Sequence, residues 1–240
     1  MKRLLSIITI MGLIIQVYAA PFDSDTLKTS AGPVVMTFIG HGTLVFTFNN
    51  QVIHVDPVSR YADYTSLPDA DLILITHQHG DHLDKKAVDA IIKEGTVTFL
   101  TESCLSQLPG TVLKNGDEKT IGNIKIEAVP AYNLEHKRDN GQPFHPKGIG
   151  NGYVLTFGDK RIYVAGDTED IPEMADLKNI DVAFLPMNLP YTMNPEMVAH
   201  SVSLFHPKIL YPYHYGSTDV NKLISLMGDS SCEVRVRNLQ

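Results

Sequence analysis

The sequence predicts a mixed α/β (α+β) fold in which two mixed β-sheets pack face to face and helices cover their outer sides. Short runs rich in β-branched and aromatic residues, typical of strands, alternate with segments whose apolar residues recur at helical spacing. This series of hairpins and helices occurs twice along the 240 residues, and no linker separates the two halves. Because 43% of the residues are hydrophobic and only 20% are charged, the chain can form one sizeable core. We therefore expect a single domain.

The first half opens with a polar stretch, residues 21–32, that we expect to form a loose lead-in. Asn49-Asn50 supplies a tight turn between two strands, and the fully apolar run that follows Asp71 is typical of a buried central strand. Asp84 stands at the expected N-cap of a helix. The strands expected in this half are residues 34–39, 43–48, 51–55, 72–75 and 96–100, with one helix at 84–93.

The second half contains a polar segment, residues 133–151, that is rich in Gly and Pro and long for a connection. Loops of this length are often functional. Short strands precede it, and a strand pair that turns at Gly158-Asp159 follows it. The expected strands are residues 111–113, 118–121, 123–129, 152–157, 161–165, 181–185, 208–213 and 232–236, and the expected helices are 172–177, 195–205 and 218–227.

The first residues have the composition of an export signal. Lys2 and Arg3 give a positive start, an apolar stretch follows to about position 17, and small residues fit signal-peptidase cleavage after Ala19. The protein is therefore expected in the periplasm or outside the cell. The alternative is an uncleaved membrane anchor, but the apolar stretch is shorter than the ~20 residues that a span typically needs. We divide the chain into a signal peptide, residues 1–19, and a domain, residues 20–240.

The charge of the chain limits its partners. The formal net charge is −7 and no basic tract is present, which excludes general nucleic-acid binding and favours a small-molecule substrate. Cys104 and Cys232 could pair in an oxidising compartment or remain two separate buried side chains. The sequence leaves that question open, and it also leaves open whether the chain forms a homo-oligomer.

The densest group of chemically active residues is the run His77-Gln78-His79-Gly80-Asp81-His82, between an expected buried strand and an expected helix. Imidazole and carboxylate groups are common ligands of divalent metals. Alternate residues of an extended turn point the same way, so His77 and His79 can share one ion, while Asp81 and His82 can reach a second. A solvated polar turn is the structural alternative, and the density of donor groups favours metal binding.

The pattern His77-x-His79-x-Asp81-His82 after an apolar strand resembles the signature of the metallo-β-lactamase superfamily. The resemblance extends over nearly all of the mature chain, and the spacing is most similar to the branch related to ascorbate-6-phosphate lactonase. It implies a four-layer αβ/βα sandwich with two divalent metal ions at one edge. The other segments that resemble superfamily motifs are residues 40–41, 53–57, 165–168, 171–174 and 211–216.

The resemblance also implies a ligand set, in which Asp167 bridges the two ions. The usual third histidine of the first site has no counterpart near Asn133, so His136 and His145 are the candidates, and we prefer His145 because residues 144–148 resemble similar proteins at this point. The ions are expected to be zinc, with manganese or iron as alternatives, because His and Asp sites accept all three. The implied ligands are His77, His79, Asp81, His82, His145, Asp167 and His214.

The remaining histidines, His41, His54, His200 and His206, are expected to have structural or supporting roles. Asp56 ends a strand near the same edge and could hydrogen-bond a ligand imidazole, since metal-bound histidines usually need such a partner.

The implied ligands predict a metal-dependent hydrolase in which a hydroxide between two ions attacks a lactone, ester or phosphodiester. Asp81 and His82 are the expected catalytic residues, with Asp81 orienting the water and accepting its proton. We expect a small anionic substrate bound by Tyr132, Asn133, Lys147, Tyr191 and Tyr215.

The alternative is a non-catalytic, metal-dependent binding module on the same fold, which the missing histidine near Asn133 supports. Fewer than two bound ions per chain would favour that alternative. β-Lactam hydrolysis is not expected, because Asp167 occupies a position where the lactamases usually carry Cys or Ser.

Overall fold

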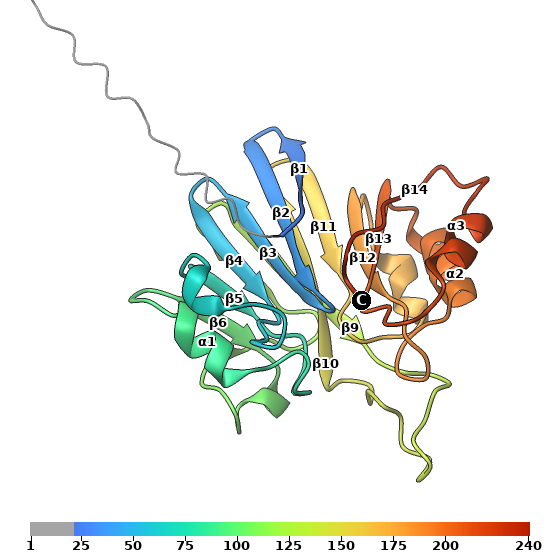
Figure 1. Ribbon diagram of the computed structural model, residues 1–240, viewed down its shortest axis with the longest axis horizontal. Helices are drawn as coiled ribbons and strands as arrows, with labels where there is room; N and C mark the ends of the chain where they lie inside the picture. The colour runs from blue at the N-terminus through green and yellow to red at the C-terminus, as the bar shows by residue number, and fades with distance from the viewer. Residues whose placement is uncertain (1–21) are drawn as a thin grey trace, which may run out of the picture.

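The computed structural model describes residues 22–240, which fold into two seven-stranded mixed sheets that face one another (Figure 1). The predicted two-sheet sandwich is therefore confirmed. The strands of the first sheet, side by side in chain order, are β1 (Ser24–Thr29), β2 (Gly32–Gly40), β3 (Thr43–Phe48), β4 (Gln51–Val55), β5 (Leu72–Leu74), β6 (Val97–Leu100) and β7 (Thr111–Val112). Those of the second, also in chain order, are β8 (Glu118–Ile121), β9 (Ile124–Ala131), β10 (Gly150–Phe157), β11 (Lys160–Val164), β12 (Val182–Pro186), β13 (Ile209–Tyr213) and β14 (Glu233–Val234).

Helices flank the outer sides of both sheets (Figure 1). Helix α1 (Lys85–Ile91) lies outside the first sheet, and α2 (Pro195–Phe205) and α3 (Val220–Leu226) lie outside the second. Asp84 caps α1 through a hydrogen bond from the backbone N–H of Lys86, as its position in the sequence predicts. Three short 3-10 segments complete the described helical structure: η1 (Tyr64–Ser66), η2 (Glu102–Cys104) and η3 (Pro172–Asp176).

One local expectation is wrong, and one helix differs in type. Residues 24–29 form the edge strand β1, paired antiparallel with β2, instead of a loose lead-in. Its side chains are half-buried or exposed, so it carries no apolar stripe by which the sequence could reveal it. The helix expected at residues 172–177 is present as a 3-10 helix, residues 172–176, and the chain is extended again at Leu177.

Aromatic side chains join the two sheets across the core. Phe46 of β3 contacts Phe184 of β12, with ring centroids 6.1 Å apart, and Phe48 contacts Phe157 at 5.1 Å. All four side chains are fully buried, so each contact excludes water from the space between the sheets. A second apolar cluster packs α1 onto the outer face of the first sheet.

The direction of the strands decides where the polar side chains gather. In the first sheet β2, β4 and β5 share one direction, and in the second β9, β11, β12 and β13 do so. The carboxyl ends of such strands commonly carry binding residues. The residues that follow these strand ends are His41, Asp56, His77, Asn133, Asp167, Asn188 and His214.

Three further expectations from the sequence concern the signal peptide, a membrane anchor and the two cysteines. The expected signal peptide, residues 1–19, lies outside the described residues. Within residues 22–240, no helix is both long enough and apolar enough to cross a membrane. Cys104 and Cys232 are both buried and do not form a disulfide.

Candidate metal centre

The strand ends and the long loop bring His and Asp side chains into overlapping groups of potential metal ligands. Within each group, one donor atom per residue lies within 4.8 Å of the others. All seven ligands implied by the sequence meet at this edge of the sandwich. The groups found among residues 22–240 are His77 with His79 and His145; His77 with His82 and Asp167; and His41 with Asp81, His82 and His214.

Asp167 stands between these groups. Its Oδ1 lies 3.3 Å from Nε2 of His82, while its Oδ2 lies 3.2 Å from Nε2 of His145 and 3.6 Å from Nε2 of His214. The Asp167 carboxylate therefore lies between the imidazoles of the strand ends and that of the long loop.

Two glycines permit the close approach of the backbone to the centre. Gly166 has a φ of +66°, and a Cβ at this position would lie 2.6 Å from the carbonyl oxygen of Asn151. A Cβ on Gly42 would lie 2.7 Å from Cε1 of His82. Both positions therefore require glycine for the donor groups to converge.

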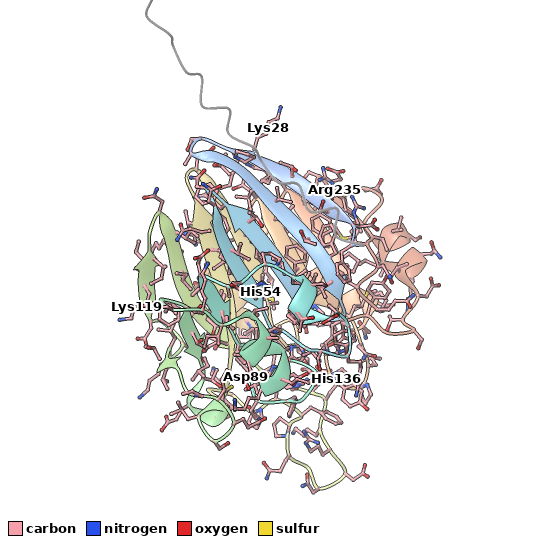
Figure 2. The ribbon with its side chains drawn as sticks, turned by 60° about the vertical axis from the view of Figure 1, so that its left-hand side comes forward. Lys28, His54, Asp89, Lys119, His136 and Arg235 are labelled. Atoms are coloured by element: carbon pink, nitrogen blue, oxygen red, sulfur yellow. The ribbon has the colours of Figure 1, made fainter. Side chains whose placement is uncertain are left out.

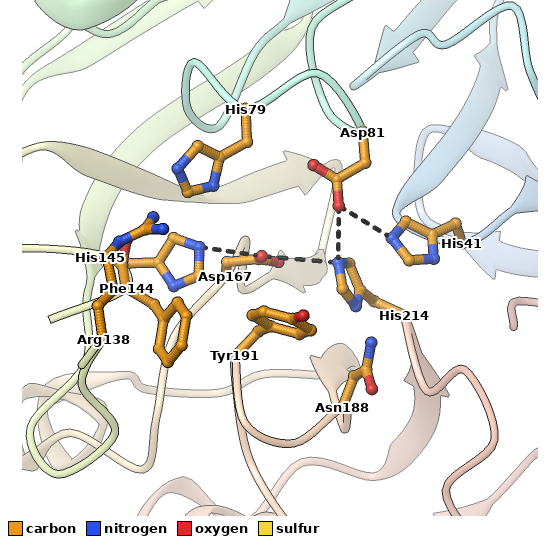
Figure 3. A pocket seen from close by; sticks show the side chains of 10 residues that line it. All are labelled: His41, His79, Asp81, Arg138, Phe144, His145, Asp167, Asn188, Tyr191 and His214. Carbon is orange, nitrogen blue, oxygen red and sulfur yellow. Dashed lines mark hydrogen bonds and ion pairs between the residues drawn. The ribbon is translucent and has the colours of Figure 1, made fainter.

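The donor set fits a divalent metal ion. Nε2 of His82, Nε2 of His214 and Oδ1 of Asp167 are buried and lack a hydrogen-bond partner within residues 22–240. An unpaired buried polar group costs about 1–3 kcal/mol, and a cation placed among these atoms would offset that cost. Figure 3 shows the side chains of His79, Asp81, Asp167 and His214 directed toward a common space.

The protonation states of the first group suit ligation. Burial lowers the pKa of His77 well below its ordinary range and also lowers the pKa of His79, so both imidazoles are neutral near pH 7. Burial opposes ionisation of Asp167, but the surrounding imidazoles of His214 and His82 hold its pKa well below the usual value. His77 and His79 therefore stand as neutral imidazoles beside the ionised carboxylate of Asp167.

Asp56 fixes the orientation of His82. Its Oδ2 lies 2.7 Å from Nδ1 of His82 and accepts a hydrogen bond from Oγ1 of Thr76, while its Oδ1 accepts one from the Thr76 backbone N–H. With Nδ1–H directed at this carboxylate, Nε2 of His82 faces the centre. Burial alone would lower the pKa of His82, but the carboxylates of Asp167 and Asp56 raise it well above the ordinary range, so a metal ion at Nε2 displaces a proton.

Asn133 orients His145 in a similar way. Its side-chain oxygen accepts hydrogen bonds from the backbone N–H of His145 at 2.8 Å and from Nδ1 of the same residue at 2.7 Å. Nε2 of His145 then faces Asp167. The expected contact of Asn133 with substrate is corrected, because the side chain is buried behind His145.

A buried carboxylate, Glu169, anchors the start of the long loop. It accepts hydrogen bonds from the backbone N–H groups of residues 134, 135 and 136, and from the side-chain amide of Asn133. Its Oε1 also lies 2.6 Å from Nδ1 of His136. His136, the second candidate for the first metal site, is thereby held by Glu169 and belongs to none of the ligand groups.

A cavity of about 280 Å³ opens beside the donor groups (Figure 3). This volume lies just below the ~300–1,000 Å³ typical of small-molecule sites. Of the five residues expected to bind substrate, Tyr191 alone lines it. The lining residues are His41, His79, Asp81, Arg138, Phe144, His145, Asp167, Asn188, Tyr191 and His214.

Three of the expected substrate contacts are satisfied elsewhere and are corrected. Nζ of Lys147 lies 2.6 Å from the Glu173 carboxylate and 3.2 Å from the Tyr132 hydroxyl, which itself donates to Glu173. This pairing neutralises the cation that was expected to bind an anion. The hydroxyl of Tyr215 donates to the backbone carbonyl of Arg237.

His41 lies closer to the metal centre than its expected supporting role implies. Its Nε2 lies 3.4 Å from Oδ2 of Asp81, and it lines the cavity. The available signal was the Gly40-His41-Gly42 run at the end of a strand. His54, His200 and His206 lie outside the centre, and Figure 2 shows His54 in the first sheet and His136 in the long loop.

Comparisons with known proteins agree with this geometry. The model of the β-lactamase superfamily domain matches residues 35–214. The chain is 31% identical over 219 residues to a UPF0173 metal-dependent hydrolase of Thermococcus onnurineus, which covers 82% of this chain and 94% of that protein. It is also 31% identical over 199 residues to a UPF0173 metal-dependent hydrolase of Nanoarchaeum equitans, covering 77% and 85% of the two chains.

A crystal structure from Parabacteroides distasonis is also similar. That protein, provisionally named a metal-dependent hydrolase, is 54% identical and superimposes with a TM-score of 0.88. The match covers 91% of this chain and 100% of the other.

Proposed function

The chain belongs to the β-lactamase superfamily, and from this premise we propose that it is a metal-dependent hydrolase that cleaves a lactone, ester or phosphodiester in a small anionic molecule. The names of the relatives from Thermococcus onnurineus and Parabacteroides distasonis support the general activity. The observation that carries the proposal is the convergence of the ligand groups on Asp167, with buried donor atoms that lack any partner within residues 22–240.

Two ions fit the donor set, one at His77, His79 and His145 and one at Asp81, His82 and His214, with Asp167 shared. Divalent ions at these positions supply an acidified water molecule and polarise the oxygen of the scissile bond.

The chain's own residues perform the positioning. Asp81 is half-buried at the cavity wall, and its Oδ2 lies 3.4 Å from Nε2 of His41 and 3.6 Å from Nε2 of His214. Burial opposes its ionisation, but the neighbouring imidazoles of His214 and His41 hold its pKa well below the ordinary value. Asp81 therefore stays ionised, and its carboxylate accepts a hydrogen bond from the attacking water and orients it.

The first test measures metal content and hydrolysis together, on protein saturated with zinc, manganese or iron(II). We expect two ions per chain by elemental analysis and turnover on a panel of lactones, aryl esters and phosphodiesters. His79→Ala and Asp81→Asn should lose metal and activity without unfolding, because both side chains are half-buried at the cavity and neither packs in the core.

The matched control is His200→Ala, which removes an exposed imidazole paired with Asp170 and should leave metal content and turnover unchanged. Fewer than two ions at saturation, together with no turnover on any substrate class, would favour the alternative of a non-catalytic binding module.

A further inference from the structure

One side chain that lines the cavity beside the metal centre carries a positive charge at every physiological pH. Arg138 is the sole Lys or Arg among the lining residues. Figure 3 shows it next to Phe144 and His145, on the opposite side of the cavity from His214 and Asn188. An anion bound there would lie across the cavity from His214, which follows β13.

The loop that carries Arg138 folds back on itself. The backbone N–H of Arg138 donates to the carbonyl of Gln142, and the N–H of Gly141 donates to the carbonyl of Arg138, both at 2.8 Å. Lys137 and Pro143 form an isolated antiparallel bridge beside this turn. The turn brings Arg138 close to Phe144, although six positions separate them in the sequence.

Phe144 holds the guanidinium of Arg138 in position, but no carboxylate of residues 22–240 neutralises its charge. Its central carbon lies 5.0 Å from the centroid of the Phe144 ring, and a terminal nitrogen lies 3.4 Å from the Phe144 carbonyl oxygen. No carboxylate within residues 22–240 forms an ion pair with it, whereas Lys147, on the same loop, is paired with Glu173 at 2.6 Å. Arg138 therefore lines the cavity with its charge available for a ligand.

The wall next to Arg138 is aromatic. The rings of Phe144 and Tyr191 meet edge to face with centroids 5.1 Å apart, and both line the cavity. Tyr191 is 45% exposed, so it presents much of its ring to a ligand. Aromatic walls bury the apolar part of a ligand, while a guanidinium binds carboxylate or phosphate oxygens in pairs.

We propose that Arg138 binds an anionic group of the substrate, a carboxylate or a phosphate, and that Phe144 and Tyr191 pack against the apolar part beside it. The inference rests on the proposed hydrolase function and names the substrate class. The preferred substrate carries a fixed negative charge at the end remote from the bond that is cleaved. Arg138 thus determines specificity, and Lys147 does not.

The test compares two esters that differ in one charge. The probes are the 4-nitrophenyl ester of pentanoic acid, which is neutral, and the mono-4-nitrophenyl ester of glutaric acid, which has the same chain length and a terminal carboxylate. The loss of a hydrogen-bonded charge pair costs about 1.5–3 kcal/mol, so Arg138→Gln should raise the KM of the anionic ester about 10- to 100-fold. The KM of the neutral ester and both kcat values should stay the same.

Two further variants sharpen the result. Arg138→Lys should restore part of the preference, because it returns the charge without the two-pronged geometry. Lys147→Gln, the matched control on the same loop, should change neither substrate's KM. A third ester with a terminal phosphate in place of the carboxylate distinguishes the two sources of negative charge.

Direct binding of glutarate to metal-loaded protein, measured by calorimetry, separates this inference from the proposed function. If no ester is cleaved but Arg138→Gln weakens glutarate binding and Lys147→Gln does not, hydrolysis has failed and the anion site stands. If Arg138→Gln leaves glutarate binding unchanged, or weakens both esters equally, the inference is overturned.

Discussion

His82 and His145 approach Asp167 from opposite parts of the fold, at 3.3 Å and 3.2 Å, yet different structures hold them in place. His82 follows the end of β5 and is oriented by Asp56, a fully buried carboxylate at the end of the neighbouring strand β4. The hydrogen bonds of Asp56 to Thr76 also tie the two strand ends together. The strand side of the centre is therefore part of the same structure that stabilises the sheet.

The loop side depends on a local network. His145 is oriented by Asn133, which donates to Glu169, and Glu169 in turn binds the backbone of residues 134–136. None of these bonds joins two strands of a sheet. Arg138, the proposed specificity residue, lies on the same loop.

The difference has a functional consequence. Changes on the strand side should cost both stability and metal binding, because one set of contacts serves both. Changes on the loop side should alter metal affinity or substrate preference while the sandwich stays folded. In such an arrangement a change in the loop can alter the site while the framework stays constant.

Asp56→Asn should have the largest effect. An amide at this position directs an N–H group toward Nδ1 of His82, so this nitrogen must accept a hydrogen bond. The imidazole then carries its proton on Nε2, the atom that faces the centre. Loss of such an orienting partner typically lowers metal affinity or activity 10- to 100-fold, and breaking a buried charge pair costs about 3 kcal/mol or more of stability. Competition with a metal chelator and urea unfolding measure the two effects.

Asp71→Asn provides the control for this substitution. Asp71 lies at the other end of β5, accepts a hydrogen bond from the backbone of Val52 and pairs with Lys93. The same chemical change there should leave metal affinity unaltered. If Asp56→Asn binds metal as tightly as the wild type, the tautomer argument is refuted.

The sequence predicted the framework well because its signals are local. The hairpin strands β3 and β4 and helix α2 were placed at their observed bounds, since alternation, turn residues and caps mark them within a few positions. The edge strand β1 could not be recognised, because its pairing with β2 decides its structure and its own side chains are largely polar.

The same distinction applies to the centre. His77 to His82 are contiguous, so their donor density is visible in the sequence itself, and a family resemblance supplied Asp167 and His214. The roles of Glu169 and Arg138 depend on which segments meet across the loop, and no local pattern marks either residue. The charge of Lys147 is visible in the sequence, so the sequence predicts that it binds an anion. Its ion pair with Glu173 forms only when the chain folds, so the sequence does not reveal it.

His54 gives the strand side a sensitivity to acid. The imidazole is fully buried in β4, with Nε2 placed 3.0 Å from the Pro68 carbonyl oxygen, and burial lowers its pKa to about 4. An unfolded chain binds the proton near the ordinary pKa of 6.5. Above pH 6.5 His54 is neutral in both states and its titration costs no stability. As the pH drops from 6.5 toward 4, the free energy of unfolding falls by about 3 kcal/mol in all, because only the unfolded chain binds the proton.

The measurement is the free energy of unfolding of wild type and His54→Gln at pH 7 and pH 5. The glutamine keeps a donor for the Pro68 carbonyl but does not titrate, so the variant should lose about 2 kcal/mol less between these pH values. Metal release on acidification affects both proteins and cancels in the difference. Equal losses in the two proteins would show that His54 is not the source of the acid sensitivity.

Glu169→Gln should have the smallest effect on the stability of the whole molecule, but it should clearly destabilise the loop. The side-chain amide can replace only one of the two carboxylate oxygens that accept the N–H groups of residues 134–136, so at least one buried donor loses its partner, at a cost of about 1–3 kcal/mol. Amide hydrogen exchange of residues 134–136 should then be about 10- to 100-fold faster, while the global free energy of unfolding falls by no more than this cost.

Glu173→Gln is the matched control, because it removes a carboxylate that pairs with the exposed Lys147 instead of the loop backbone. It should leave exchange at residues 134–136 unchanged. The decisive readout is metal affinity. If the loss of a Glu169 hydrogen bond disturbs His145, Glu169→Gln should weaken the binding of one of the two proposed ions and leave the other unchanged, since Asp56 still orients His82. Equal weakening of both ions would mean that the two sides of the centre are not independent, and the comparison between strand and loop would have to be abandoned.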